Sequence, residues 1–313
     1  MAKIAFLFPG QGSQTVGMAG EIAGTYESAA RIFNQAESIL GESFTTLMKN
    51  GPQEELTKTY NAQPALLTSS VAILEALKEK GVHMDYAAGH SLGEYSALVA
   101  ANALSFEDAL KAVRKRGELM EEAVPDGQGS MAAVLGMERS ALKDVTDEIT
   151  DQGDEVQLAN LNCPGQIVIS GSAAGVEKAS SLAKERGAKR VLPLNVSGPF
   201  HSSLMKPAAE KFQHELANIS ISNAQVPVVA NVTADAVFEA GKIEKLLVAQ
   251  LYSPVLWEDS IEQLISLGVD TFVEAGPGKV LSGLVKKINR KATVYPVYDQ
   301  ETLEAAVAAL KGE

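Results

Sequence analysis

Residues 86–100, YAAGHSLGEYSALVA, place a serine between two glycines, at the point where a short apolar run changes to small residues. The segment GHSLG fits the pattern G-x-S-x-G, in which a nucleophilic serine lies on a sharp turn from a strand to a helix. Gly89 and Gly93 are needed at their positions because side chains there would collide. The stretch predicts an α/β fold with the Ser91 hydroxyl exposed at a helix N-terminus. A simple turn in which Ser91 caps the helix is the alternative.

Apolar periodicity along the rest of the chain predicts one domain interrupted by another. From 127 to 196 the pattern reads strand, helix, strand, strand, helix, strand, which is the ferredoxin-like order. The flanking segments, 1–126 and 197–313, alternate helical and β-like runs, as one α/β domain does. The clearest runs are strands at 3–8, 226–232 and 270–275 and helices at 18–40 and 64–80.

Composition excludes several classes of protein. The 313 residues include 27 basic and 39 acidic side chains, a net charge of −12, which disfavours nucleic acid or an anionic membrane as the main partner. The single cysteine, Cys163, excludes an internal disulfide framework and a multi-cysteine metal site. The first apolar run is too short for a signal peptide, and no run approaches the length of a membrane span, so we expect a cytoplasmic protein.

A serine nucleophile needs a base, and His201 is the best placed of the histidines. It precedes Leu204 and Met205 by three and four residues, so it extends the apolar stripe of the helix expected there. At that helix N-terminus the dipole would favour the neutral imidazole that acts as a base. His214 lies off the stripe, and His90 is expected to leave its strand on the opposite face from the serine. A buried structural histidine remains the alternative for His201.

Arg116 is an unusual member of another apolar stripe. The helix that begins near Ser105 carries its apolar residues on one face, and Arg116 falls on that face. An inward guanidinium demands an anion, because an unpaired buried charge costs several kcal/mol. The anion is either a protein carboxylate or a substrate carboxylate held by two parallel hydrogen bonds.

The loop GQGSQT after the first strand is not a dinucleotide-binding fingerprint, because Thr15 stands where the third glycine of G-x-G-x-x-G is needed. The loop instead supplies Gln11 and backbone amides beside the end of that strand. α/β-hydrolase folds place part of the oxyanion hole in this position.

Seven segments, taken in order, resemble the malonyl-CoA:acyl carrier protein transacylases of fatty acid synthesis. They are FPGQGSQ, QPALL, GHSLGEYSALVAA, RKRGELM, NLNCPGQIVISG, VSGPFHSSLM and EAGPGKVL. The resemblance covers nearly the whole chain. The fold it implies, an α/β-hydrolase-like domain with a ferredoxin-like insert, agrees with the division into 1–126 plus 197–313 and 127–196.

The resemblance also implies roles for individual residues. Ser91 would be the nucleophile and His201 the base, with the backbone carbonyl of Gln250 against the histidine ring. Gln11 and the N–H of Leu92 would surround the oxyanion. Phe precedes the catalytic histidine in relatives that prefer malonyl groups, and here that residue is Phe200. The expected substrate contacts are Arg116, with the malonyl carboxylate, and Phe200, Met120 and Asn162.

The implied reaction is a double displacement. The malonyl group would pass from malonyl-CoA to Ser91 and then to the phosphopantetheine thiol of acyl carrier protein, with no metal or tightly bound cofactor and with the enzyme as a monomer. A serine hydrolase or thioesterase with the same site is the alternative. The resemblance implies an acidic carrier, so it would dock on a local basic cluster, either Lys286, Lys287, Arg290 and Lys291 or Lys184, Arg186, Lys189 and Arg190. Both clusters could equally be solvated faces.

Overall fold

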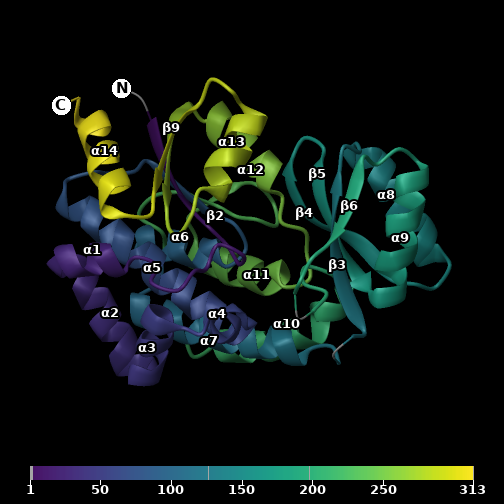
Figure 1. Ribbon diagram of the computed structural model, residues 1–313, viewed down its shortest axis with the longest axis horizontal. Coiled ribbons are helices and arrows are strands. Elements are labelled where there is room, and N and C mark those ends of the chain that lie inside the picture. Colours follow the sequence, from purple (N-terminus) through teal and green to yellow (C-terminus); the bar gives the residue numbers. More distant parts are fainter. Residues whose placement is uncertain (1–2, 126, 197, 313) are drawn as a thin grey trace.

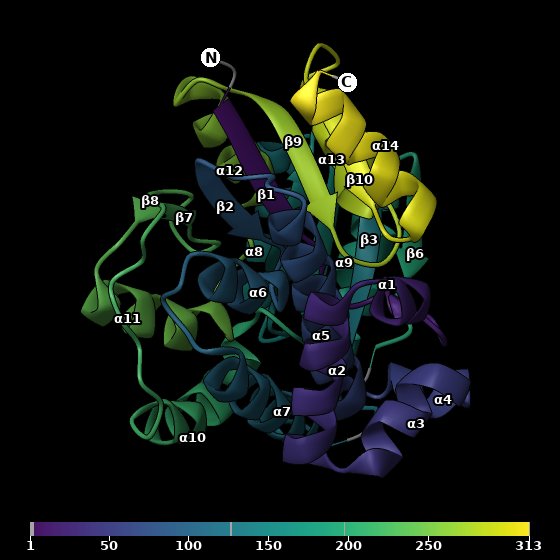
Figure 2. The ribbon, with the colours of Figure 1, turned by 90° about the vertical axis from the view of Figure 1, so that its left-hand side faces the viewer.

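The central element of the fold is a mostly parallel sheet. The computed structural model describes residues 3–125, 127–196 and 198–312 (Figure 1). Within them, six strands pair in the order β10-β9-β1-β2-β7-β8, and all neighbours are parallel except β7 and β8. In Figure 2 the arrows of β9 and β2 point the same way. The strands are β1 (Lys3–Phe8), β2 (Tyr86–Gly89), β7 (Val228–Val229), β8 (Ala236–Val237), β9 (Val269–Ala275) and β10 (Thr293–Val297).

Helices cover both faces of this sheet. They are α1 (Gly20–Thr25), α2 (Glu27–Leu40), α3 (Glu42–Asn50), α4 (Gln53–Thr57), α5 (Thr59–Glu79), α6 (Gly93–Ala100), α7 (Phe106–Glu122), the 3-10 turn η1 (Ser203–Met205), α10 (Lys206–Leu216), α11 (Ala240–Gln250), α12 (Trp257–Ser266), α13 (Val280–Ile288) and α14 (Gln300–Lys311). Among the described residues, no helix combines the length and the apolar character that crossing a membrane would require.

Strand β1 contributes to two hydrophobic cores, because successive side chains of a strand point to opposite faces. Phe6 and Phe8 belong to the larger core, which includes apolar residues of α2, α5, α6 and α7. Ala5 and Leu7 belong to the second core, with residues of α12 and α13. All four side chains are at most 1% exposed. The mixed α/β class expected from the sequence is confirmed.

A second sheet lies in the segment between the two parts of this domain. Its four strands pair antiparallel in the order β4-β5-β3-β6, and its chain order is strand, helix, strand, strand, helix, strand. The elements are β3 (Gly129–Leu135), α8 (Arg139–Asp151), β4 (Val156–Cys163), β5 (Gln166–Ser172), α9 (Ala173–Glu185) and β6 (Arg190–Pro193). Residues 126 and 197, at the two expected domain boundaries, lie outside the described ranges, so the proposed division into domains stays a prediction.

The insert is joined to the main domain along β4. Leu161 donates its N–H to the carbonyl of Val255 (2.9 Å), and Val255 donates to the carbonyl of Ala159 (2.8 Å). Val255 lies just before α12, so these two bonds dock the insert beside the central sheet (Figure 1).

Two helix predictions were wrong in their limits. The run at 18–40 is divided into α1 and α2, with extended backbone at Tyr26. Helix α5 starts at Thr59 and includes Pro64 in its interior. Proline has no N–H to donate to the carbonyl four residues earlier, which is that of Tyr60. Nη1 of Arg114 donates to this carbonyl instead, at 3.0 Å, so the helix continues through the proline.

Candidate active site

The serine turn has the geometry that the sequence predicts. Ser91 lies between β2 and α6 with φ of +51°, a left-handed conformation that is strained for a non-glycine residue. A Cβ on Gly89 would lie 1.9 Å from the carbonyl of Gly93, and one on Gly93 would lie 2.0 Å from the carbonyl oxygen of Phe8. Both glycines are therefore required by close backbone contacts. The N-cap residue of α6 is Leu92 rather than Ser91, so a turn in which Ser91 only caps the helix does not describe the site.

Ser91, His201 and Gln250 form a hydrogen-bonded chain. The Oγ of Ser91 lies 2.8 Å from Nε2 of His201, and Nδ1 of His201 lies 2.8 Å from the backbone carbonyl oxygen of Gln250. Gln250 is the last residue of α11, where carbonyls lack partners within the helix. Because a carbonyl can only accept, Nδ1 carries the proton in neutral His201, which leaves Nε2 free to take the proton of Ser91.

The environment of His201 keeps its ring neutral. Its pKa is lowered to about 3, first by burial and then by the charge of Arg116. The hydrogen bond to the Gln250 carbonyl raises the pKa, but by less than Arg116 lowers it. The expected position at a helix N-terminus was wrong. His201 lies in a turn before η1, with φ of +58°, and its N–H donates to the carbonyl of Leu251 at 3.1 Å. The neutral ring is therefore due mainly to burial rather than to a helix dipole.

Arg116 is completely buried and faces the nucleophile. Its Nη1 donates to Oε1 of Gln63 at 2.9 Å, while Nη2 donates to Oε1 of Gln250 at 2.9 Å and to Oγ of Ser91 at 3.1 Å. Its Nε has no partner within the described part of the chain. No ion pair within 4.0 Å joins it to a carboxylate there. The salt-bridge alternative is therefore not found, and the guanidinium keeps capacity for an anion.

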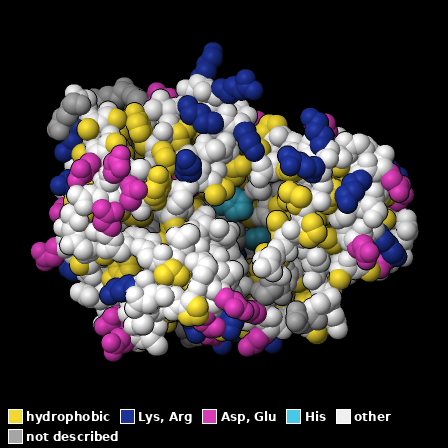
Figure 3. Space-filling model, viewed as in Figure 1, with side chains coloured by type: hydrophobic (Ala, Val, Ile, Leu, Met, Phe, Trp, Pro, Cys, Tyr) yellow, Lys and Arg dark blue, Asp and Glu magenta, His cyan; other side chains and the backbone are white. Residues whose placement is uncertain are grey.

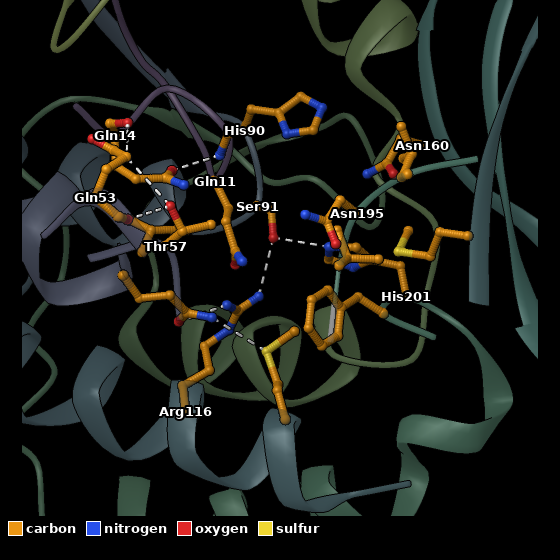
Figure 4. Close-up of a pocket in the computed structure, with 18 residues that line it drawn as sticks. Gln11, Gln14, Gln53, Thr57, His90, Ser91, Arg116, Asn160, Asn195 and His201 are labelled. Atoms are coloured by element: carbon orange, nitrogen blue, oxygen red, sulfur yellow. Dashed lines mark hydrogen bonds between the residues drawn. The ribbon is translucent and has the colours of Figure 1, made fainter. Parts of the chain in front are cut away.

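These side chains open onto a cavity of about 470 Å³ between the main domain and the insert. Figure 3 shows histidine side chains in this hollow, with Lys and Arg along its upper rim. In Figure 4, Ser91 is central, His201 and Arg116 approach it from different sides, and Asn160 and Asn195 face them from the insert. The predicted residues that line the cavity are Gln11, Ser91, Leu92, Arg116, Met120, Phe200 and His201.

The two residues expected to supply the oxyanion groups line the same cavity as the serine. The N–H of Leu92, at the start of α6, has no backbone acceptor among the described residues. Free N–H groups are typical of a helix N-terminus and can stabilise negative charge. Gln11 lines the same cavity and donates its side-chain amide to Oγ1 of Thr59 at 3.3 Å. Their roles in catalysis stay a prediction.

Asn162 does not line the cavity, in contrast to the expected substrate contact. Its Oδ1 lies 2.8 Å from Nε2 of His90, so its side chain is occupied by the ring next to the nucleophile. Asn160, two residues earlier, lines the cavity instead. The pairing of β4 with β5 shifts register between Leu158 and Asn160 and again after Leu161, so simple alternation did not indicate which asparagine faces the cavity.

His90 also differs from its expected placement. It lines the cavity, and its ring lies 5.4 Å from that of Trp257. The sharp turn at Ser91 breaks the strand alternation on which the expectation rested.

Sequence reasoning missed three residues that support the site. Gln63 accepts from Arg116, Asn231 accepts the N–H of Ser91 on its Oδ1 (2.7 Å), and Glu94 accepts from Gln250. Glu94 lies inside the segment GHSLGEYSALVAA, and its place in the first turn after the serine could have indicated it. Gln63 lies inside QPALL, and its place in the buried part of α5 could have indicated it.

The two predicted basic clusters lie on elements that adjoin at the edge of the insert. Nζ of Lys287 donates to Oε1 of Gln166 at 2.8 Å, which ties α13 to the insert. Gln166 pairs with Leu135 across the sheet, and Leu135 pairs with Arg190 of β6. Lys287 and Arg190 are both exposed, whereas Arg186 makes an ion pair with Glu148.

Comparisons with known proteins find relatives over nearly the whole chain. The acyl transferase domain family matches residues 5–311. A malonyl CoA-acyl carrier protein transacylase of Bacillus subtilis (strain 168) is 61% identical over 313 residues, which is 100% of this chain and 99% of that protein. The crystal structure of the corresponding protein from Clostridium perfringens has a TM-score of 0.96 and 45% identity, over 99% of this chain and 98% of that one. A malonyl-transacylase solved with its type II PKS acyl-carrier protein has a TM-score of 0.95 and 42% identity, over 100% of each chain.

Proposed function

Because the chain belongs to the acyl transferase domain family, and its relatives over the full length are malonyl CoA-acyl carrier protein transacylases, we propose that Ser91 carries a malonyl group between two thiols. The enzyme transfers the malonyl group of malonyl-CoA to acyl carrier protein, which supplies fatty acid synthesis. The observation that carries the role of the site is the buried Arg116, which contacts Oγ of Ser91 at 3.1 Å and, among the described residues, has no carboxylate within 4.0 Å.

In the first half-reaction, His201 takes the proton of the Ser91 hydroxyl through Nε2 while Oγ attacks the thioester carbonyl. The negative charge that develops on the carbonyl oxygen faces the N–H of Leu92 and the loop of Gln11. The bond from carbon to sulfur then breaks, and protonated His201 returns its proton to the sulfur, which releases coenzyme A as a thiol. The malonyl group remains as an ester on Ser91.

In the second half-reaction, the phosphopantetheine thiol of the carrier gives its proton to His201, and its sulfur attacks the ester. The ester bond to Oγ breaks, and Ser91 recovers its proton. The Gln250 carbonyl holds the histidine ring through both steps. Atoms and charges balance with these residues alone, so we propose that no metal or bound cofactor takes part.

Arg116 selects the acyl group in this proposal. The group attached to Oγ of Ser91 begins beside the guanidinium, so the terminal carboxylate of malonyl can reach its N–H groups. An acetyl group has no carboxylate and leaves the buried charge without an anion. Phe200 and Met120 form apolar walls of the same cavity and leave Arg116 as the charged group that faces the substrate's end.

The carrier docks on the basic surface formed by α13 and β6 in this proposal. An acidic carrier would be attracted there, and the surface lies beside the mouth of the cavity (Figure 3). The monomeric state and the cytoplasmic location expected from the sequence stay predictions.

Mass spectrometry after incubation with malonyl-CoA tests the proposed function. We expect a malonyl adduct on Ser91 that persists until a carrier thiol is added, and no adduct in Ser91→Ala. Rapid release of free malonate without an acceptor would instead favour the hydrolase alternative. Transfer at the wild-type rate by Ser91→Ala would show that the nucleophile is another residue.

A further inference from the structure

Glu94 is a buried acid that the reaction above does not use. It lies in the first turn of α6, three residues after Ser91, and only 3% of its surface is exposed. In the described part of the chain, no Lys, Arg or His approaches its carboxylate within 4.0 Å. Burying a carboxylate without an ion pair costs folding free energy, so we asked which groups its oxygens contact.

Both contacts of Glu94 go to residues that hold the active site. Its Oε2 accepts the backbone N–H of Asn231 at 3.0 Å and the side-chain amide of Gln250 at 2.8 Å. Asn231 in turn accepts the N–H of Ser91. The other end of the Gln250 amide, Oε1, accepts from Nη2 of Arg116. Glu94 and Arg116 are thus joined through a single amide group.

Glu94 is the charged one of three acceptors that fix which way the Gln250 amide points. Nε2 of Gln250 also donates to the backbone carbonyl of Ser91 at 3.1 Å and to Oδ1 of Asn231 at 3.3 Å. An amide has a donor end and an acceptor end, and a carboxylate can only pair with the donor end. With its NH₂ group on Glu94, the amide presents its oxygen to the guanidinium. The reversed amide would place NH₂ donors against Arg116, which has donors only, and would leave the carboxylate facing an oxygen.

We infer that Glu94 is a positioning residue for substrate selection, which turns the Gln250 amide oxygen toward Arg116 and so holds the guanidinium beside Ser91. This inference rests on the proposed function. Burial raises the pKa of Glu94 to about 7, against the effects of its two hydrogen bonds and of Arg116. Both bonds use Oε2, so a proton on Oε1 leaves them in place and the positioning holds in either charge state.

The test is a double-mutant cycle read out as the rate of Ser91 acylation, kcat/KM, from malonyl-CoA and acetyl-CoA. Glu94→Leu has a similar volume but no acceptor, and we expect it to lower the malonyl rate by about 10- to 100-fold. In an Arg116→Ala background the same change should cost less than about 3-fold, because the group that Glu94 positions is absent. Equal losses in both backgrounds would mean general damage to the site and would overturn the inference.

Two further variants keep the test decisive if Glu94→Leu does not fold. Glu94→Gln retains one oxygen that can accept both bonds, so it should recover the malonyl rate to within about 5-fold of wild type. Gln250→Met keeps the backbone carbonyl on His201 but removes the amide, and it should lower the malonyl rate at least 10 times more than the acetyl rate. Equal loss of both rates in Gln250→Met contradicts the inference. The proposed function fails separately, if wild-type enzyme forms no malonyl adduct on Ser91.

Discussion

Nη2 of Arg116 lies 3.1 Å from Oγ of Ser91, on a different side from Nε2 of His201, which lies 2.8 Å from the same oxygen (Figure 4). The nucleophile is therefore in contact with a neutral base and with a buried cation. The base can take the serine proton, and the cation can hold the far end of an acidic acyl group.

Removing the base should slow acylation far more than removing the side chain that lies behind it. His201→Ala is expected to lower the rate of Ser91 acylation by about 10²- to 10⁴-fold, the usual contribution of a general base. Gln250→Ala keeps the backbone carbonyl on Nδ1, so its rate of acylation from acetyl-CoA should fall much less than that of His201→Ala. Acetyl-CoA is the substrate for this comparison because it has no carboxylate to contact Arg116. Rapid-mixing measurements of adduct formation compare the two. A carboxylate found within hydrogen-bond distance of the His201 ring would contradict this account of how the ring is held.

The acylation rate should show no ionisation of His201 between pH 8 and pH 5. Burial, assisted by Arg116, lowers the pKa of His201 to about 3, so the ring is already neutral throughout this range. The base form is lost only as pH falls toward 3. We expect kcat/KM for malonyl-CoA to be flat, with Glu94→Gln measured beside wild type to remove the carboxyl group whose pKa is raised to about 7. An inflection near pH 6.5 that persists in Glu94→Gln would show that His201 titrates as an ordinary histidine.

Glu94→Gln should stabilise the fold more at pH 8 than at pH 5. The pKa of Glu94 is raised from 4.5 to about 7 in the folded protein, so the folded state binds the proton more tightly than the unfolded state. Wild-type stability from this group is complete below pH 4.5 and is lost as pH rises through 7. Glutamine does not titrate, so Tm of the variant minus Tm of wild type should increase with pH. Thermal unfolding at several pH values measures it, and a constant difference would exclude the raised pKa.

Reversing charge on the basic surface formed by α13 and β6 should weaken carrier binding selectively. Lys287→Glu and Arg190→Glu are each expected to raise KM for the carrier several-fold at low salt, with a smaller effect at high salt and on malonyl-CoA. Lys49→Glu, an exposed change on α3, is the matched control for net charge. Steady-state kinetics at two salt concentrations measure the effect. Carrier KM values that match those of Lys49→Glu would exclude this surface.

Much of the fold and of the site could be predicted from local patterns. The turn at Ser91 was predictable because only glycines fit where Gly89 and Gly93 touch neighbouring backbone. Arg116 was predictable because it interrupts an otherwise apolar helix face, and burial followed from that face. In both cases a few adjacent residues contain the physical reason for the structure.

The remaining features depend on contacts between distant segments. Asn231 and Glu94 lie 137 residues apart, and no local pattern shows that they meet. The choice between Asn160 and Asn162 depends on register shifts in β4. Helix α5 runs through Pro64 because Arg114 of another helix satisfies the free carbonyl. Such features become visible only when the chain is folded.

The proposal that Arg116 selects the acyl group by its charge is tested most directly by the kcat/KM of Arg116→Ala for malonyl-CoA and for acetyl-CoA. Loss of one partner of a buried charge pair costs roughly 2 to 5 kcal/mol, so the malonyl value should fall by about 30- to 5,000-fold. The acetyl value should hold or rise, because the variant no longer buries an unpaired cation beside a neutral group. Equal loss of both activities would contradict the account, since it would mean that Arg116 maintains the site and does not select the substrate.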